Sequence, residues 1–101
     1  MNKLGIFYAY WTREWDVDFV PFVPKVKGLG FDVLEVNAGT VAKMSADERD
    51  RLRGEAEARG IELTSCVGLP AEYDVASPDA GTRRRGIEFL KRQAENVRSI
   101  G

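Results

Sequence analysis

The sequence predicts an α/β fold built from successive βα units with parallel strands. Residues 29–34 and residues 59–64 are similar, and in both a glycine closes a helical pattern just before an extended run begins. Glycine is favoured after the end of a helix because it readily adopts left-handed backbone angles. The two stretches lie about 30 residues apart, which is the size of one βα unit. The repeat therefore indicates strand–helix alternation.

Three strands are expected, near residues 4–9, 32–36 and 61–67, each followed by a helical pattern. Their near-continuous apolar character favours parallel strands covered by helices and linked by right-handed crossovers. A (β/α)₈ barrel takes about 250 residues, so three of its eight units need roughly 94. The chain has 101 residues. We therefore expect the first three βα units of a (β/α)₈ TIM barrel, truncated, with two open sheet edges that favour a homo-oligomer.

The first helix is expected over residues 18–29, where apolar side chains fall on one stripe of an amphipathic helix. The stripe consists of Phe19, Phe22, Val23, Val26 and Leu29. Pro24 would remove a backbone hydrogen bond inside this helix. The pattern therefore predicts either a kink or a late helix start.

The second helix has the clearest boundaries. Ser45 and Glu48 fit a capping box, in which serine and glutamate satisfy each other's free amides, and Gly60 ends the helix. The third helix is expected to open at Ser77-Pro78-Asp79, with the serine as its cap and the proline in its first position. Its buried stripe is predicted to be Ile87, Leu90, Ala94 and Val97.

Composition excludes several classes of protein. The 15 basic residues are balanced by 16 acidic ones, which is unlike the basic surface of a nucleic-acid binder. Histidine is absent, and the single cysteine cannot form an internal disulfide. No apolar run approaches the roughly 20 residues that cross a bilayer. We expect a cytoplasmic protein with no nucleic-acid partner and no membrane partner.

A ligand site in such a fold lies at the carboxyl ends of the strands, here residues 7–15, 35–43 and 66–73. The first of these loops is dense in aromatic residues, which suits stacking on a sugar ring, but the same residues could instead cap the core. Glu35 either binds a polar ligand or pairs with an arginine. Cys66 is expected to pack in or line a pocket, because no histidine is present to activate it as a nucleophile.

Several segments together resemble the ketose 3-epimerases, the family of D-tagatose 3-epimerase and D-psicose 3-epimerase. They are residues 1–11 (MNKLGIFYAYW), Glu14-Trp15, residues 28–36 (GLGFDVLEV), residues 66–69 (CVGL), residues 72–74 (EYD) and residues 76–79 (ASPD). The resemblance is to the amino terminus of these enzymes and covers nearly the whole chain. Phe7 together with Cys66 and the 72–74 segment is closer to the D-tagatose 3-epimerase branch.

The resemblance implies one domain over residues 1–101, the N-terminal part of a xylose-isomerase-like TIM barrel, with no second domain. Such enzymes invert C3 of free ketohexoses such as D-tagatose, D-fructose or D-psicose. They use Mn²⁺, or Mg²⁺ or Co²⁺, together with two glutamates that exchange the C3 proton through an enediolate. Phe7, Trp15 and Cys66 match residues that line the substrate. The catalytic glutamates and the metal ligands come from later strands, so this chain is expected to hold no catalytic residue and no metal ion, and to be inactive alone.

Two other functions stay open. The chain could belong to a related sugar or sugar-phosphate isomerase of the same superfamily. It could instead be a non-catalytic part-barrel that self-associates through its strand edges.

Overall fold

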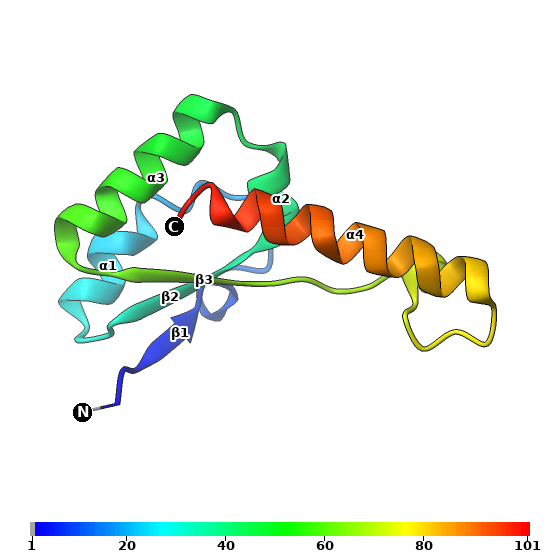
Figure 1. Cartoon of the computed structure of the whole chain (residues 1–101). Coiled ribbons are helices and arrows are strands. Elements are labelled where there is room, and N and C mark those ends of the chain that lie inside the picture. Colours follow the sequence, from blue (N-terminus) through cyan, green and yellow to red (C-terminus); the bar gives the residue numbers. More distant parts are fainter. Residues whose placement is uncertain (1) are drawn as a thin grey trace.

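The structure is a computed structural model that describes residues 2–101. It contains a three-stranded parallel sheet of β1 (Gly5–Phe7), β2 (Val33–Asn37) and β3 (Glu62–Cys66), in the order β1-β2-β3 (Figure 1). The predicted strand–helix alternation and the parallel direction are confirmed. The strands are shorter than predicted, and β1 ends where residues Tyr8–Tyr10 turn into the 3₁₀ helix η1.

The core lies between the sheet and the helices that cover one of its faces. Successive side chains of a strand point to opposite faces. In β2, Leu34 and Val36 are fully buried in this core, whereas Val33, Glu35 and Asn37 are only partly buried. The other face of the sheet therefore carries Glu35 and its neighbours, and no helix within residues 2–101 covers it. Among the described residues, no helix is long and apolar enough to cross a membrane.

The first helix starts late, which is one of the two alternatives that the sequence predicted. Helix α1 spans Phe22–Gly28, so Pro24 occupies its third position, where a backbone amide has no partner within the helix. Phe19 is fully buried although it precedes the helix. Leu29 follows the helix and is 59% exposed, so its predicted place on the apolar stripe of this helix is wrong.

The predicted ends of the helix between β2 and β3 are confirmed, but only the serine half of the predicted capping box is found among the described residues. Helix α3 spans Ala46–Arg59, the Ser45 hydroxyl accepts a hydrogen bond from the Glu48 amide at 3.1 Å, and Gly60 is left-handed with φ 66°. A further short helix, α2 (Ala38–Lys43), precedes it and was not predicted. Its cap is Asn37, whose side-chain oxygen accepts from the Gly39 amide at 3.2 Å.

The last helix, α4, spans Ala80–Arg98 and differs from the prediction at its start. The cap is Asp79, whose carboxylate accepts from the Thr82 amide at 2.8 Å, and not Ser77. The Ser77 hydroxyl instead accepts from the Asp79 amide at 3.1 Å. Pro78 thus lies before the cap rather than inside the helix.

The predicted buried stripe of α4 is also wrong. Ile87 is 48% exposed, Ala94 is exposed, and Leu90 and Val97 are only half-buried. The helix projects beyond the end of the sheet (Figure 1) and packs on α2 and on the 3₁₀ helix η2 (Ala71–Tyr73). At that second contact Gly86 is required, since a Cβ there would collide with the Tyr73 carbonyl. The exposure of these side chains shows that the part of the chain described by the structure leaves the apolar stripe of α4 largely uncovered.

Candidate functional site at the carboxyl ends of the strands

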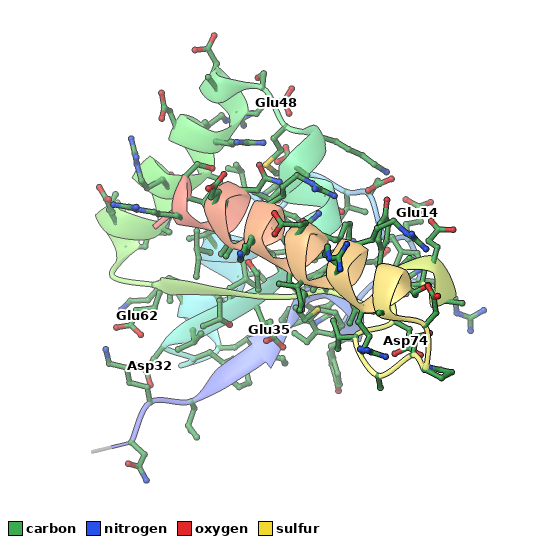
Figure 2. All side chains as sticks on the ribbon, turned by 45° about the vertical axis from the view of Figure 1, so that its right-hand side comes forward. Glu14, Asp32, Glu35, Glu48, Glu62 and Asp74 are labelled. Atoms are coloured by element: carbon green, nitrogen blue, oxygen red, sulfur yellow. The ribbon has the colours of Figure 1, made fainter. Side chains whose placement is uncertain are left out.

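Strand register brings the candidate residues onto one face of the sheet. Phe7 is level with Glu35, and Glu35 is level with Thr64, so the three form a row across β1, β2 and β3. Asn37 and Cys66 form the next row towards the carboxyl ends. All five belong to the face that no helix covers. Figure 2 shows the Glu35 side chain near the end of β1, apart from the other labelled carboxylates.

Cys66 is a free, half-buried thiol in this arrangement. Burial raises the pKa of the thiol, and the negative charge of Glu35 raises it further. Cys66 is therefore protonated at neutral pH, and the chain has no histidine that could remove its proton. The side chain can pack against a ligand but is a poor nucleophile.

Glu35 has no basic partner in the described part of the chain. None of the ion pairs among residues 2–101 involves it. Pairing with an arginine, one of the two predicted alternatives, is therefore not found within these residues. The carboxylate is half-buried on the uncovered face, where it can accept hydrogen bonds from a polar group brought to the sheet.

The aromatic residues after β1 divide between the two predicted roles. Tyr8 is fully buried and makes edge-on contacts with the rings of Phe7 and Phe19, at 4.9 and 4.8 Å between centroids. Trp11 stacks on Phe22 at 5.8 Å. These residues close the core. Tyr10 and Trp15, by contrast, are 77% and 65% exposed. Phe7 touches the core through Tyr8 and remains only half-buried.

A hydrogen-bond network that the sequence did not reveal fixes the backbone at Trp15. The Trp15 carbonyl accepts from the Tyr8 hydroxyl at 3.0 Å and lies 2.9 Å from the Thr40 hydroxyl. The same Thr40 oxygen lies 2.9 Å from an Asp16 carboxylate oxygen. It also accepts a hydrogen bond from the side-chain amide of Asn37 at 3.1 Å. Residues 15 and 16 are thereby tied to the end of β2. The Trp15 indole itself stays largely exposed and is not packed with the other candidates.

Asp16 also pairs with Lys43 of α2 at 2.7 Å. Hydrogen bonds from Lys43 and Thr40 lower the pKa of the Asp16 carboxyl. The only sequence signal for this network is the Asn37-x-x-Thr40 spacing at the start of a helix, which is common to many capped helices. Nothing in the spacing identifies the distant partners.

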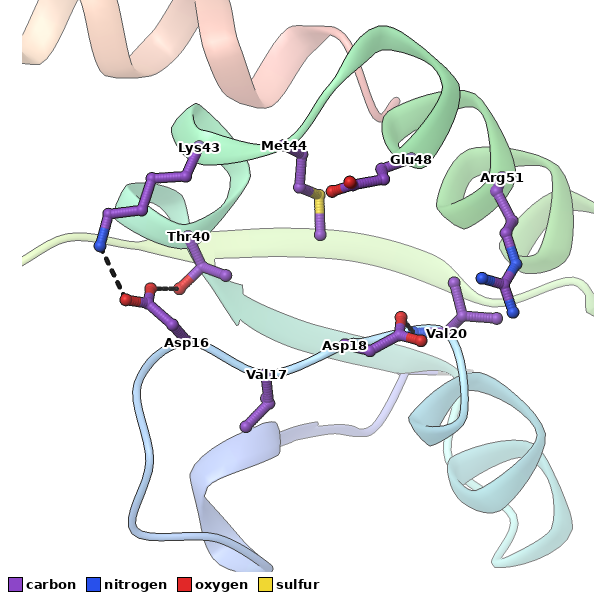
Figure 3. A pocket seen from close by; sticks show the side chains of 9 residues that line it. All are labelled: Asp16, Val17, Asp18, Val20, Thr40, Lys43, Met44, Glu48 and Arg51. Carbon is purple, nitrogen blue, oxygen red and sulfur yellow. Dashed lines mark hydrogen bonds and ion pairs between the residues drawn. The ribbon is translucent and has the colours of Figure 1, made fainter.

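A groove of about 480 Å³ lies beside this network (Figure 3). Acidic, basic and apolar side chains line it: Asp16, Val17, Asp18, Val20, Thr40, Lys43, Met44, Glu48 and Arg51. Phe7, Trp15 and Cys66 do not line it, so the groove is distinct from these candidate substrate-binding residues.

The described residues do not provide a metal centre. No three His, Cys, Asp or Glu side chains in residues 2–101 come together as a ligand set. A divalent ion of the kind the family resemblance implies does not fit the donors present in this part of the chain.

Known proteins provide the context for this geometry. No protein-family model matches the sequence. The chain is 38% identical over 98 residues to D-psicose 3-epimerase of Agrobacterium fabrum, which covers 97% of this chain and 34% of that enzyme. It is 39% identical over 87 residues to D-psicose 3-epimerase of Ruminiclostridium cellulolyticum, covering 86% and 30% respectively.

Solved structures agree with the sequence comparison. A crystal structure of D-psicose 3-epimerase in the presence of D-fructose matches with a TM-score of 0.89 and 37% identity, over 98% of this chain and 34% of that one. L-ribulose 3-epimerase matches with a TM-score of 0.76 and 23% identity, over 100% of this chain and 33% of that one, which supports the fold alone. The chain therefore belongs to the ketose 3-epimerase family, and it spans about a third of the length of the relatives it matches.

Proposed function

We propose that the chain is the amino-terminal part of a ketose 3-epimerase, three βα units of a (β/α)₈ barrel whose uncovered sheet face forms one wall of the sugar pocket. The observation that carries the proposal is the placement of Phe7, Glu35 and Cys66 on one face at the carboxyl ends of the strands. Enzymes with parallel βα architecture bind substrate at this end. The half-buried state of these side chains on a face with no covering layer also supports it.

Each side chain has a distinct task in this proposal. The Phe7 ring packs against the apolar face of the ketose and orients it. The Cys66 thiol, kept neutral by burial and by Glu35, fills space beside the sugar without reacting. Trp15 is held at the rim by the bonds from Tyr8 and Thr40 to its carbonyl. These residues position the substrate and do not move protons.

Epimerisation at C3 of free ketohexoses needs an acid–base pair on opposite faces of the substrate. A bound divalent ion would stabilise the charge of the enediolate. Residues 2–101 hold no ligand set for such an ion, so these groups are assigned to the part of the enzyme that the chain does not span. Candidate substrates are D-tagatose, D-fructose and D-psicose.

The test is a chimera in which residues 1–101 replace the matching segment of the Agrobacterium fabrum enzyme. We expect the chimera, supplied with Mn²⁺, to interconvert D-fructose and D-psicose. Phe7→Ala should lower the kcat/KM of the chimera by a factor that corresponds to about 1–3 kcal/mol of transition-state stabilisation. Turnover should remain, because stacking is lost while the acid–base pair is kept. The matched control is Leu29→Ala, which truncates an exposed apolar residue outside the candidate face.

Two results would contradict the proposal. One is a chimera that folds, by circular dichroism and a cooperative melt, yet turns over none of the three ketoses. The other is equal kinetics for Phe7→Ala and the unmodified chimera on all three sugars. The gene gives an independent check: the reading frame should continue and encode paired glutamates, an aspartate and a histidine. A stop codon directly after Gly101 would favour the self-associating part-barrel.

A further inference from the structure

The uncovered face of the sheet carries two carboxylates whose surroundings differ. Glu62 stands at the amino end of β3, level with Val33, and forms an ion pair with Lys3. Glu35 lies one same-face position nearer the carboxyl ends, level with Thr64. None of the ion pairs and none of the side-chain hydrogen bonds within residues 2–101 involves Glu35. Its oxygens are therefore left to accept hydrogen bonds from a group outside this part of the chain.

The side chains around Glu35 offer a ligand no comparable acceptor. Asn37, the next residue of β2 on this face, already accepts from the first turn of α2 and donates to Thr40. Cys66, level with Asn37, carries a neutral thiol, which accepts hydrogen bonds only weakly. Phe7, level with Glu35, offers only its ring. A hydroxyl group brought to this wall therefore finds its strongest acceptor in the Glu35 carboxylate.

The position of Glu35 makes a partner necessary in the whole enzyme. The side chain is already half-buried within residues 2–101. The remaining strands of a closed barrel would remove it further from water, and an ionised carboxylate there needs donors or a cation. The charge of Glu35 raises the pKa of the Cys66 thiol, so the carboxylate acts on the part of the wall where the substrate is proposed to lie. Ketose hydroxyl groups are donors that arrive at this place.

We propose that Glu35 is a substrate-binding residue of the epimerase, and that its carboxylate accepts a hydrogen bond from a ketose hydroxyl away from C2 and C3. The inference rests on the proposed function. Phe7 packs on the apolar face of the sugar, while Glu35 on the neighbouring strand fixes the orientation of the sugar by a directional bond. A contact remote from the reacting carbon stabilises the bound ketose and the transition state alike, so its loss raises KM more than it lowers kcat.

The competing role for Glu35 is an ion pair with a basic side chain from the part of the enzyme that the chain does not span. The two roles differ in what Glu35→Gln does to the enzyme without sugar. A buried cation that loses its carboxylate is strongly destabilising. A carboxylate without a protein partner is neutralised at little cost to stability.

The experiment uses the chimera described above, supplied with Mn²⁺, and compares Glu35→Gln with its matched control Glu62→Gln. Both substitutions neutralise a carboxylate of the same face and keep the shape of the side chain. We expect Glu35→Gln to raise the KM for D-fructose roughly five- to tenfold and to change kcat less than about twofold, because an amide oxygen accepts a weaker bond than a carboxylate. Glu62→Gln should leave both kinetic constants unchanged. Without sugar, the Tm of each variant should stay within about 2 °C of the unmodified chimera.

Monodeoxy analogues of D-fructose identify the hydroxyl group that Glu35 contacts. Analogues that lack the hydroxyl at C1, C4, C5 or C6 are measured as competitive ligands. We expect one of them to bind the unmodified chimera more weakly than D-fructose does, and this penalty to shrink roughly threefold or more in Glu35→Gln. Glu62→Gln should leave every penalty as it is. Changes in the ring form of an analogue are the same for all variants and cancel in the comparison.

Either of two results would overturn the proposal. The first is an unchanged KM for D-fructose in Glu35→Gln, or penalties for all the analogues that are the same as in the unmodified chimera. The second is a Tm of Glu35→Gln more than about 4 °C below that of Glu62→Gln, or loss of cooperative folding in Glu35→Gln alone, which would make a basic side chain the partner of Glu35. An unmodified chimera that folds but turns over no ketose would instead contradict the proposed function, so the two failures are distinguishable.

Discussion

Thr40→Val removes the hydroxyl at the centre of the network that holds residues 15 and 16 to the sheet, while keeping the shape of the side chain. Thr40 is 6% exposed. Its oxygen accepts a hydrogen bond from the side-chain amide of Asn37 at 3.1 Å. It lies 2.9 Å from both the Trp15 carbonyl oxygen and an Asp16 carboxylate oxygen. One hydroxyl proton serves only one of these two acceptors. The loss therefore amounts to the bond from the Asn37 side chain and one bond donated by the Thr40 hydroxyl, at about 1 kcal/mol each.

The expected cost is about 1–2 kcal/mol, because Tyr8 still donates to the Trp15 carbonyl and Lys43 still pairs with Asp16. Urea unfolding of the 101-residue chain by far-ultraviolet circular dichroism measures it. All variants are compared at one protein concentration, because association adds to apparent stability. The control Thr40→Ser keeps the hydroxyl and should cost about 1 kcal/mol for the lost methyl group. A serine variant less stable than the valine variant would refute the hydrogen-bond account.

Three further predictions concern charge, the thiol and association. Because the folded pKa of Asp16 lies below its ordinary value of 3.8, its stabilising contact is present above pH 3.8 and is lost as the pH falls through the folded value. Asp16→Asn should flatten this acid dependence in urea titrations, and an unchanged curve would contradict it. Alkylation of Cys66 by iodoacetamide should have its pH midpoint above the ordinary thiol pKa of 9.0. Glu35→Gln should lower that midpoint only in part, since burial contributes more than Glu35 to the raised pKa of the thiol. The 101-residue chain should associate through its open strand edges in size exclusion with light scattering, whereas a monodisperse monomer with one sharp melt would argue for an autonomous domain.

Local signals explain which parts of the fold were predictable. Helix α3 was predicted at both ends because Ser45 and Gly60 act through contacts within a few residues. The strands were predicted because a glycine stands at or just before the start of each one. At α4, Ser77 and Asp79 are both capable caps, and the sequence alone did not distinguish them. Helix α2 was missed because it has six residues, one of them glycine.

Tertiary context explains the rest. An amphipathic stripe predicts which face of α4 seeks a partner, but not whether that partner belongs to the same segment of chain. Ile87 and Ala94 are therefore exposed despite a correct helical period. The placement of Phe7, Glu35 and Cys66 on one face depends on strand register, which the alternation of residues suggests but does not fix. The bonds from Tyr8 and Thr40 to Trp15 join segments with no shared motif.

We propose that the uncovered face of this sheet is a wall of the ketose pocket. Protection of Cys66 by substrate tests this proposal, since Cys66 is the only cysteine in the 101 residues. In the active chimera, modification of Cys66 by iodoacetamide is followed by mass spectrometry of the peptide that contains it, with and without saturating D-fructose. We expect D-fructose to slow this modification several-fold, whereas D-glucitol, which lacks the ketone, should not slow it at the same concentration. Modification at the same rate with and without D-fructose, in a chimera that turns D-fructose over, would contradict it.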